Sequence, residues 1–153
     1  MSKIFLTLAL AILAATAPNA TAQDKSAVVA VVHQFVDSFN KGDAKAALAT
    51  CADEVSIIDE FPPHEWHGAD ACAKWMNDYD GDAKKHGVTG GVVTLGALRH
   101  VDITADRAYV VAPAGYAYKQ NGKPVKEARS TLTVVLQKGS GGWRIIAWTW
   151  TKN

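Results

Sequence analysis

The chain has 153 residues, a length typical of one domain with a single hydrophobic core. Its 16 Lys and Arg residues almost balance its 15 Asp and Glu residues, and the basic residues are scattered along the sequence. A nearly neutral surface gives no electrostatic reason to expect nucleic acid or an anionic membrane as a partner. The composition therefore favours small uncharged or amphipathic partners.

The N-terminal segment has the pattern of a secretory signal peptide. An apolar run follows Lys3, and Ala20-Thr21-Ala22 forms an A-x-A cleavage pattern before Gln23. The run is too short to span a bilayer, and small residues follow it. We therefore expect cleavage after Ala22, which removes residues 1–22 and exports residues 23–153 as a single periplasmic or secreted domain without membrane association. An uncleaved N-terminal anchor is the alternative.

The sequence contains two cysteines, Cys51 and Cys72, and both lie in the part that we expect to be exported. Outside the reducing cytoplasm, such a pair favours a disulfide over free thiols. The loop that it would close has about 20 residues, for which the loop-entropy estimate is ~3 kcal/mol. A metal site is a weaker interpretation, because C-x-x-C spacing and a neighbouring His-x3-His pattern are both absent.

The first part of the mature chain has helical periodicity. Between Asp24 and Asn40 the apolar residues repeat at the spacing of one buried helical stripe. They are Val28, Val31, Val32, Phe35, Val36 and Phe39. Gly42 is a suitable C-terminal cap for this helix, and Asp43 a suitable N-cap for a short second helix over residues 44–50.

A strand and a third helix follow. The run EVSIID, residues 54–59, predicts a strand that stops at Pro62-Pro63, and residues 64–68 are expected to return beside it. Residues 69–87 then carry a helix with Ala71, Cys72, Trp75, Met76 and Tyr79 along one face.

The remainder of the chain predicts an antiparallel meander. Four runs rich in valine, threonine and aromatic residues cover roughly residues 91–103, 107–119, 124–138 and 142–151. Turn residues separate the runs, and Asn121-Gly122 is a strong hairpin signal. The order of elements predicts an α+β domain with helices on one face of the sheet. If such a sheet curls around its helices, the open end of the resulting cone is a natural small-ligand pocket.

Three segments resemble the SnoaL-like branch of the nuclear transport factor 2-like superfamily. They are HQFVDSFNKGDAKAALATCADEVSIID, EWHGADACAKW and GGWRIIAWTWTKN, and the resemblance covers nearly all of the mature chain. Its most specific pieces are FNKGD, the Gly68 that opens the third helix, and the terminal Gly-Trp-Arg-Ile strand. The resemblance implies a cone-shaped curved antiparallel sheet wrapped around N-terminal helices, the nuclear transport factor 2-like or cystatin-like fold. Members of the superfamily include isomerases, cyclases, hydratases, hydrolases, binding modules and assembly domains, so function must come from the site.

Asp59 is the first candidate for chemistry. It lies nine residues before Gly68, which is similar to the position of the catalytic base in ketosteroid isomerases of the same superfamily. Desolvation at a pocket mouth would raise the pKa of this carboxyl and suit it to proton transfer at carbon. The resemblance places Phe35 where those isomerases have an oxyanion-hole tyrosine. Their second oxyanion-hole donor is a protonated aspartate on a later strand, and residues 125–138 of this sequence contain no Asp. We therefore do not expect steroid isomerisation. Asp59 could serve another reaction, or simply cap the turn before Pro62-Pro63.

Other polar residues complete the candidate site. His100, Tyr116 and Tyr118 could donate protons, and Arg129, if it faces inward, needs a carboxylate such as Asp59 as its partner. A metal site is not expected from the cluster Glu60, His64, Glu65 and His67, because strand alternation separates these side chains. No cofactor motif occurs in the sequence.

Aromatic residues give the sequence its most distinctive feature. Aromatic and polar residues expected to line a ligand cavity are Phe35, Trp66, Trp75, Tyr79, Tyr116, Tyr118, Arg129, Trp148 and Trp150. Alternation along the last strand predicts Trp148 and Trp150 on one face and Trp143 and Ile145 on the other, so one face could form a dimer interface.

Three functions follow from these observations. The first is an exported module that binds a small, largely apolar molecule and forms a homodimer. The second is an isomerase, hydratase or cyclase with Asp59 as general base. The third is a structural or dimerisation module.

Overall fold

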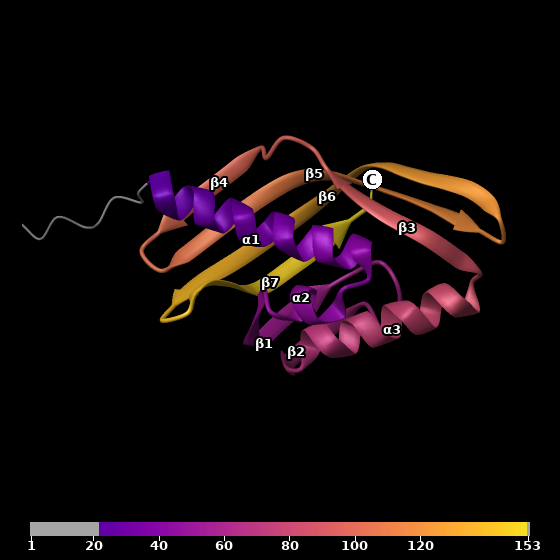
Figure 1. Cartoon of the computed structure of the whole chain (residues 1–153), viewed down its shortest axis with the longest axis horizontal. Helices are drawn as coiled ribbons and strands as arrows, with labels where there is room; N and C mark the ends of the chain where they lie inside the picture. Colours follow the sequence, from indigo (N-terminus) through magenta and orange to yellow (C-terminus); the bar gives the residue numbers. More distant parts are fainter. Residues whose placement is uncertain (1–21, 153) are drawn as a thin grey trace, which may run out of the picture.

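The structure is a computed structural model that describes residues 22–152. Its elements, in chain order, are α1 (Ala22–Lys41), α2 (Ala44–Leu48), β1 (Cys51–Ile58), β2 (Glu65–Ala69), α3 (Ala71–Lys85), β3 (Val88–Leu95), β4 (His100–Thr104), β5 (Arg107–Gln120), β6 (Lys123–Gly139) and β7 (Gly142–Thr151). The predicted α+β architecture is confirmed (Figure 1). The predicted signal peptide lies outside the described residues, apart from Ala22.

The strands form a curved seven-stranded sheet in the order β2-β1-β7-β6-β5-β3, with β4 also paired to β5 (Figure 1). The pairings are antiparallel with one exception, because β1 lies parallel to β7. The sheet is therefore mixed, whereas the sequence predicted an antiparallel one. The pairing of β1 with β7 joins two strands that are far apart in the sequence, which patterns within a single run cannot predict.

The first run of the predicted meander is two strands in the structure. β3 pairs with residues 114–120 of β5, and β4 pairs with residues 107–111 of the same strand. The segment between them stays attached to β5, because Gly96 N–H donates to the Pro113 carbonyl at 2.8 Å and Arg99 N–H to the Val111 carbonyl at 2.9 Å. The chain thus follows β5 around the bend of the sheet in two pieces.

The predicted helix periodicity is confirmed. Val28, Val32, Phe35 and Val36 of α1 are buried in the core. The side chain of Asp43 caps α2 by accepting a hydrogen bond from the Ala46 N–H at 3.0 Å. This second helix ends at Leu48, slightly earlier than predicted.

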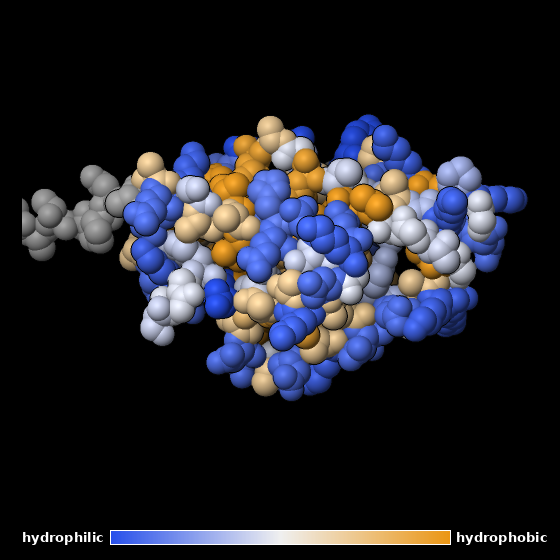
Figure 2. Space-filling view, in the orientation of Figure 1, coloured by the Kyte–Doolittle hydropathy of each residue, from blue (hydrophilic) through white to orange (hydrophobic). Residues whose placement is uncertain are grey.

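The core lies between the helices and one face of the sheet. α1 contacts β7 and β3, and α3 contacts β1, β2 and β3 (Figure 1). The buried sheet residues that face α1 and α3 include Val134, Leu136 and Ile145. In the space-filling view, polar residues cover much of the helical side and apolar residues show between them (Figure 2). No helix among residues 22–152 is long and apolar enough to cross a membrane.

The end of α1 is joined to strand β3 through one side chain. The Asn40 amide donates to the Val93 carbonyl at 2.8 Å and accepts from the Val93 N–H at 2.8 Å. Both backbone groups of this residue on the outermost strand are thereby satisfied by a helix side chain. This pair of bonds fixes the distance between α1 and β3.

Two β-bulges change which side chains face the helices. In β7, Ala147 pairs with Val135 and Ile145 with Leu136, so Ile146 is the extra residue. As a result Trp148 and Trp150 lie on the same face as Ile145 and Trp143. The partners of these four residues are every second residue of β6, from Leu132 to Lys138, and so point to one face. The prediction that Trp143 and Ile145 lie on the opposite face was therefore wrong.

In β6 the second bulge lies at Ala128 and Arg129. Ser130 pairs with Ala114 and Glu127 with Tyr116, so two residues of β6 lie opposite the single residue Gly115 of β5. The backbone of Arg129 has φ 71°, in the left-handed region. Because of this bulge, Glu127 shares the inner face with Ser130.

The hairpin of β1 and β2 brings the two cysteines together. β1 pairs antiparallel with β2 from Glu54 opposite Ala69 to Ile58 opposite Glu65. The predicted disulfide is present, joining Cys51 at the start of β1 to Cys72 in the first turn of α3. The resemblance implied that Gly68 opens α3, and this prediction was wrong. It lies in β2 opposite Val55, and the helix begins after Asp70.

Removal of the disulfide is expected to lower the free energy of unfolding. The double variant Cys51→Ala/Cys72→Ala should lose about 3 kcal/mol, because the unfolded chain is no longer cross-linked. Urea denaturation with and without reductant measures this loss. Reductant should lower the stability of the wild type towards that of the variant and leave the variant unchanged. A loss well below about 1 kcal/mol would contradict the entropic argument.

Candidate functional site

A cavity of about 160 Å³ lies between α1, α3 and the inner face of the sheet. Half of the residues that line it are aromatic. They are Phe35, Phe39, Phe61, Trp75, Tyr79, Tyr116, Tyr118, Trp148 and Trp150. The structure therefore brings together seven of the residues that the sequence predicted as ligand-binding, and adds Phe39 and Phe61.

Trp75 of α3 is the centre of the aromatic wall. Its ring centroid lies 4.8 Å from that of Trp148, 5.6 Å from that of Phe39 and 6.2 Å from that of Phe35. Tyr79, one turn further along α3, stacks on it at 5.9 Å. Aromatic pairs at these separations stabilise one another beyond their burial. The wall is thus a rigid, packed surface.

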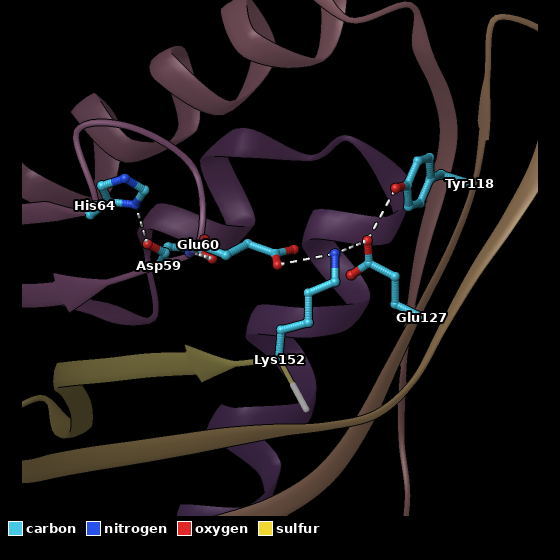
Figure 3. Close-up of polar contacts among 6 residues, drawn as sticks. All are labelled: Asp59, Glu60, His64, Tyr118, Glu127 and Lys152. Carbon is cyan, nitrogen blue, oxygen red and sulfur yellow. Dashed lines mark hydrogen bonds and ion pairs between the residues drawn. The ribbon is translucent and has the colours of Figure 1, made fainter.

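Asp59 follows the last residue of β1 (Figure 3), and it is one of the residues that line the cavity. One carboxylate oxygen accepts from the Trp75 indole N–H at 2.8 Å, and the other accepts from the Glu60 backbone N–H at 2.7 Å. Asp59 therefore both caps the turn and lines the cavity, so the two roles that the sequence left open occur together.

The environment of Asp59 raises its pKa. Burial is the largest cause, and the hydrogen bonds from Glu60 and Trp75 oppose it. The negative charge of Glu127 raises the pKa further. A carboxyl group held in this way exchanges its proton at a higher pH than an exposed aspartate, which suits general base or general acid chemistry.

Tyrosine hydroxyls form a second polar group. The hydroxyls of Tyr79 and Tyr116 are hydrogen-bonded to each other. The rings of Tyr116 and Tyr118 stack at 4.9 Å, and the Tyr118 hydroxyl donates to Glu127 Oε1 at 3.1 Å. Burial raises the pKa of all three phenols, so they stay protonated and can act as hydrogen-bond donors at neutral pH.

A charged network that the sequence did not predict includes two residues of the cavity lining, Glu60 and Glu127 (Figure 3). Lys152 Nζ lies 2.7 Å from Glu127 Oε1 and 3.3 Å from Glu60 Oε2. Burial raises the pKa of the Glu60 carboxyl, and the charge of Glu127 raises it further. The hydrogen bond to Glu127 raises the pKa of Lys152. Two carboxylates thus share one ammonium group.

Three predicted site residues lie outside this cavity. His100 of β4 is exposed, with its ring 6.0 Å from that of Tyr109. Trp66 is buried, but it packs on Phe61 and donates its indole N–H to Asp78 at 2.8 Å.

Arg129 is the third of them. It lies at the β6 bulge and lines a separate hollow together with Arg99 and Ser130. It does not pair with Asp59, whose carboxylate oxygens accept from Trp75 and Glu60 instead.

Glu127 and Lys152 were missed for a structural reason. In a regular strand, side chains alternate between the two faces, so Glu127 would lie on the outer face if Ser130 lies on the inner one. Only the bulge moves Glu127 to the inner face. Lys152 follows the last strand, and its neighbours in the sequence do not distinguish it from an exposed surface lysine. No pattern in the sequence points to either residue.

The described residues do not form a metal site. Between residues 22 and 152, no group of three or more His, Cys, Asp or Glu side chains is placed to hold a metal ion. The imidazole of His64 contacts the Asp59 carbonyl at 3.2 Å. His67 contacts the Ser56 hydroxyl at 3.2 Å and the Glu65 carboxylate at 3.3 Å.

Comparisons with known proteins agree with this geometry. A family model described as a SnoaL-like domain matches residues 28–149. A nuclear transport factor 2-like superfamily protein from Salmonella enterica superimposes with a TM-score of 0.72 at 15% identity, covering 85% of this chain and 91% of the other. A ketosteroid isomerase-like protein from Erwinia carotovora atroseptica gives 0.68 at 18% identity, covering 86% and 98%. A candidate dehydratase of the NTF2-like family from Streptomyces avermitilis gives 0.66 at 16%, covering 86% and 97%. A search of curated protein sequences found no match. At these identities the similarity shows the fold.

Asp59→Asn is expected to change how stability depends on pH. Because burial raises the pKa of Asp59, the native state binds this proton more tightly than the unfolded state does. Wild-type stability therefore falls as the pH rises from 3.8 through the raised pKa, and Asp59→Asn removes this loss. The variant should thus gain stability relative to the wild type over this interval.

Urea denaturation between about pH 4 and pH 8 measures the difference. Asp53→Asn, a change at an exposed acid of β1, is the matched control and should leave the shape of the curve unaltered. Parallel curves for the wild type and Asp59→Asn would contradict the raised pKa.

Proposed function

Because the chain belongs to the SnoaL-like domain family, we propose that it binds a small, largely apolar molecule in the aromatic cavity. The observation that carries this proposal is the wall of nine aromatic rings interrupted by a few polar groups. Such walls bind apolar ligands, and the polar groups fix their orientation. Trp148 lines the cavity, and its buried indole N–H has no hydrogen-bond partner among the described residues, so a ligand could supply an acceptor to it.

Export and dimerisation form part of this proposal. The signal-peptide pattern motivates cleavage after Ala22, and the Cys51–Cys72 disulfide supports an oxidising compartment. Val92 of β3 and Tyr109 of β5 are each 44% exposed, which supports a homodimer through the outer face of the sheet. A purely structural or dimerisation role is the competing function, and it requires no ligand in the cavity.

Gly91→Ala is expected to weaken ligand binding. A Cβ atom at this position of β3 would lie 2.2 Å from the Tyr116 hydroxyl oxygen, so the tyrosine ring must move. We expect at least about tenfold weaker binding of the neutral probe 2-naphthylmethanol, since crowding of this kind costs about 1–3 kcal/mol. Gly139→Ala is the matched control, because a Cβ atom there meets nothing within 4 Å.

Calorimetric titration of protein purified from the periplasm measures this binding. The intact mass of the same sample shows whether residues 1–22 have been removed, and its native mass gives the number of subunits. No binding of any naphthyl probe by the wild type would overturn the proposed function. Equal binding by Gly91→Ala and Gly139→Ala would place the probe outside the cavity.

A second candidate function is proton transfer at carbon, which the raised pKa of Asp59 favours. The Asp59 carboxylate would remove a proton from the carbon next to a carbonyl group, and the tyrosine hydroxyls would stabilise the resulting enolate oxygen. Return of the proton to another carbon completes an isomerisation, and loss of a β-hydroxyl as water completes the reverse of a hydration. In a cyclase the enolate carbon would attack a second carbonyl carbon of the same substrate, the π bond of that carbonyl would break, and its oxygen would take up the proton held by Asp59.

Deuterium exchange into 2-tetralone tests this chemistry. The wild type should accelerate exchange of the α-protons in deuterated buffer, measured by NMR, and Asp59→Asn should abolish at least about 90% of the acceleration. Glu65→Gln removes a carboxylate that lies outside the cavity and should leave the rate unchanged. An unaltered rate in Asp59→Asn would exclude Asp59 as the base.

A further inference from the structure

The charged groups of the cavity wall are all of one sign. Asp59, Glu60, Asp82 and Glu127 line it, and the lining includes no lysine, arginine or histidine. Lys152 contacts Glu60 and Glu127 (Figure 3). The wall therefore combines aromatic faces with an excess of carboxylates.

We propose that the cavity selects organic cations, in which an ammonium group is carried on an apolar body, over neutral and anionic molecules of the same shape. This inference rests on the proposed function and specifies its ligand class. The ammonium group binds at Glu127 and Glu60, and the apolar body packs against the aromatic wall.

The side chain of Glu127 has unused hydrogen-bonding capacity. It is 9% exposed, and its Oε1 atom accepts from both Tyr118 and Lys152. Its Oε2 atom is buried and has no hydrogen-bond partner among residues 22–152. A buried carboxylate oxygen without a donor is costly. An ammonium N–H is a donor that also carries the compensating charge.

The position of Lys152 shows that an ammonium group fits this pair of carboxylates. Its Nζ atom contacts both of them while the side chain stays 51% exposed. One positive charge serves two carboxylates, and their mutual repulsion contributes to the raised pKa of Glu60. A second cation therefore finds favourable charge at the same place.

The aromatic wall suits a cation as well. Tyr118 is hydrogen-bonded to Glu127 and stacked on Tyr116, so two phenol rings lie next to the carboxylate. Faces of aromatic rings attract cations within about 6 Å. The unpartnered Trp148 N–H adds a place for an acceptor on the ligand body. The positive charge nearest this pair of carboxylates is Lys152, and an anion that bound Lys152 would have to displace the carboxylates that already hold it.

Three probes of one shape test the charge preference. They are 2-naphthylmethylammonium, 2-naphthylmethanol and 2-naphthoate, titrated calorimetrically at pH 7 and low salt. We expect the ammonium to bind the wild type at least about tenfold more tightly than the alcohol, and the alcohol more tightly than the carboxylate.

Two variants move the ammonium affinity in opposite directions. Glu127→Gln should weaken ammonium binding about tenfold or more and so bring the affinity for the ammonium close to the affinity for the alcohol. Lys152→Met removes the competing cation and should tighten ammonium binding several-fold. Lys45→Met on the exposed surface of α2 alters the net charge by the same amount and should leave the ammonium affinity unchanged. Lys152→Met changes a half-exposed side chain, so it provides a test even if Glu127→Gln does not fold.

Each remaining outcome overturns one part of the argument. Equal affinities for the ammonium and the alcohol would overturn cation selection and leave the proposed function in place. Tightest binding of 2-naphthoate, lost in Lys152→Met, would identify an anion site at Lys152 instead. Failure of all three probes to bind would contradict the proposed function itself.

Discussion

The contact on which the rest of the structure depends is the packing of Trp75 against the inner face of the sheet. This one indole touches Phe35 and Phe39 of α1, Trp148 of β7 and Phe61 of the loop after β1. Its N–H also holds the Asp59 carboxylate. Both long helices cover the sheet through this cluster, and a large aromatic residue stabilises such a junction by the area that it removes from water. The disulfide and the Asn40 bonds to β3 hold the two ends of the same arrangement.

The same packing creates the electrostatics of the cavity. Rings that close over the end of β1 exclude water from Asp59, and this exclusion raises its pKa more than its hydrogen bonds lower it. Burial likewise keeps the tyrosine hydroxyls protonated. Glu60 and Glu127 share a single lysine, so negative charge gathers beside aromatic faces. A binding site and a set of proton-transfer groups therefore arise from one wall, and the fold alone does not decide between those uses.

Much of this arrangement follows from local patterns. The apolar repeat from Val28 to Phe39 places one face of α1 in the core, and Asn121-Gly122 forms the β5–β6 turn that its residues predicted. Seven of the nine residues proposed as ligand contacts line the cavity, since large aromatic side chains in amphipathic elements point to the core. Asp59 could also be located, because Pro62-Pro63 ends the strand just beyond it.

The sequence by itself determined most of the elements, their order, the cysteine pair and most of the aromatic wall, because each depends on residues close together in the chain or on a periodicity of one element. Only the tertiary structure decided which faces meet. Bulges at Ile146 and at Ala128-Arg129 each insert one residue into a strand, and one residue reverses every side chain beyond it. Whether a bulge forms depends on the partner strand and on the curvature of the whole sheet. That is why Trp143 faces inward, Glu127 reaches Lys152, and Arg129 lies outside the cavity.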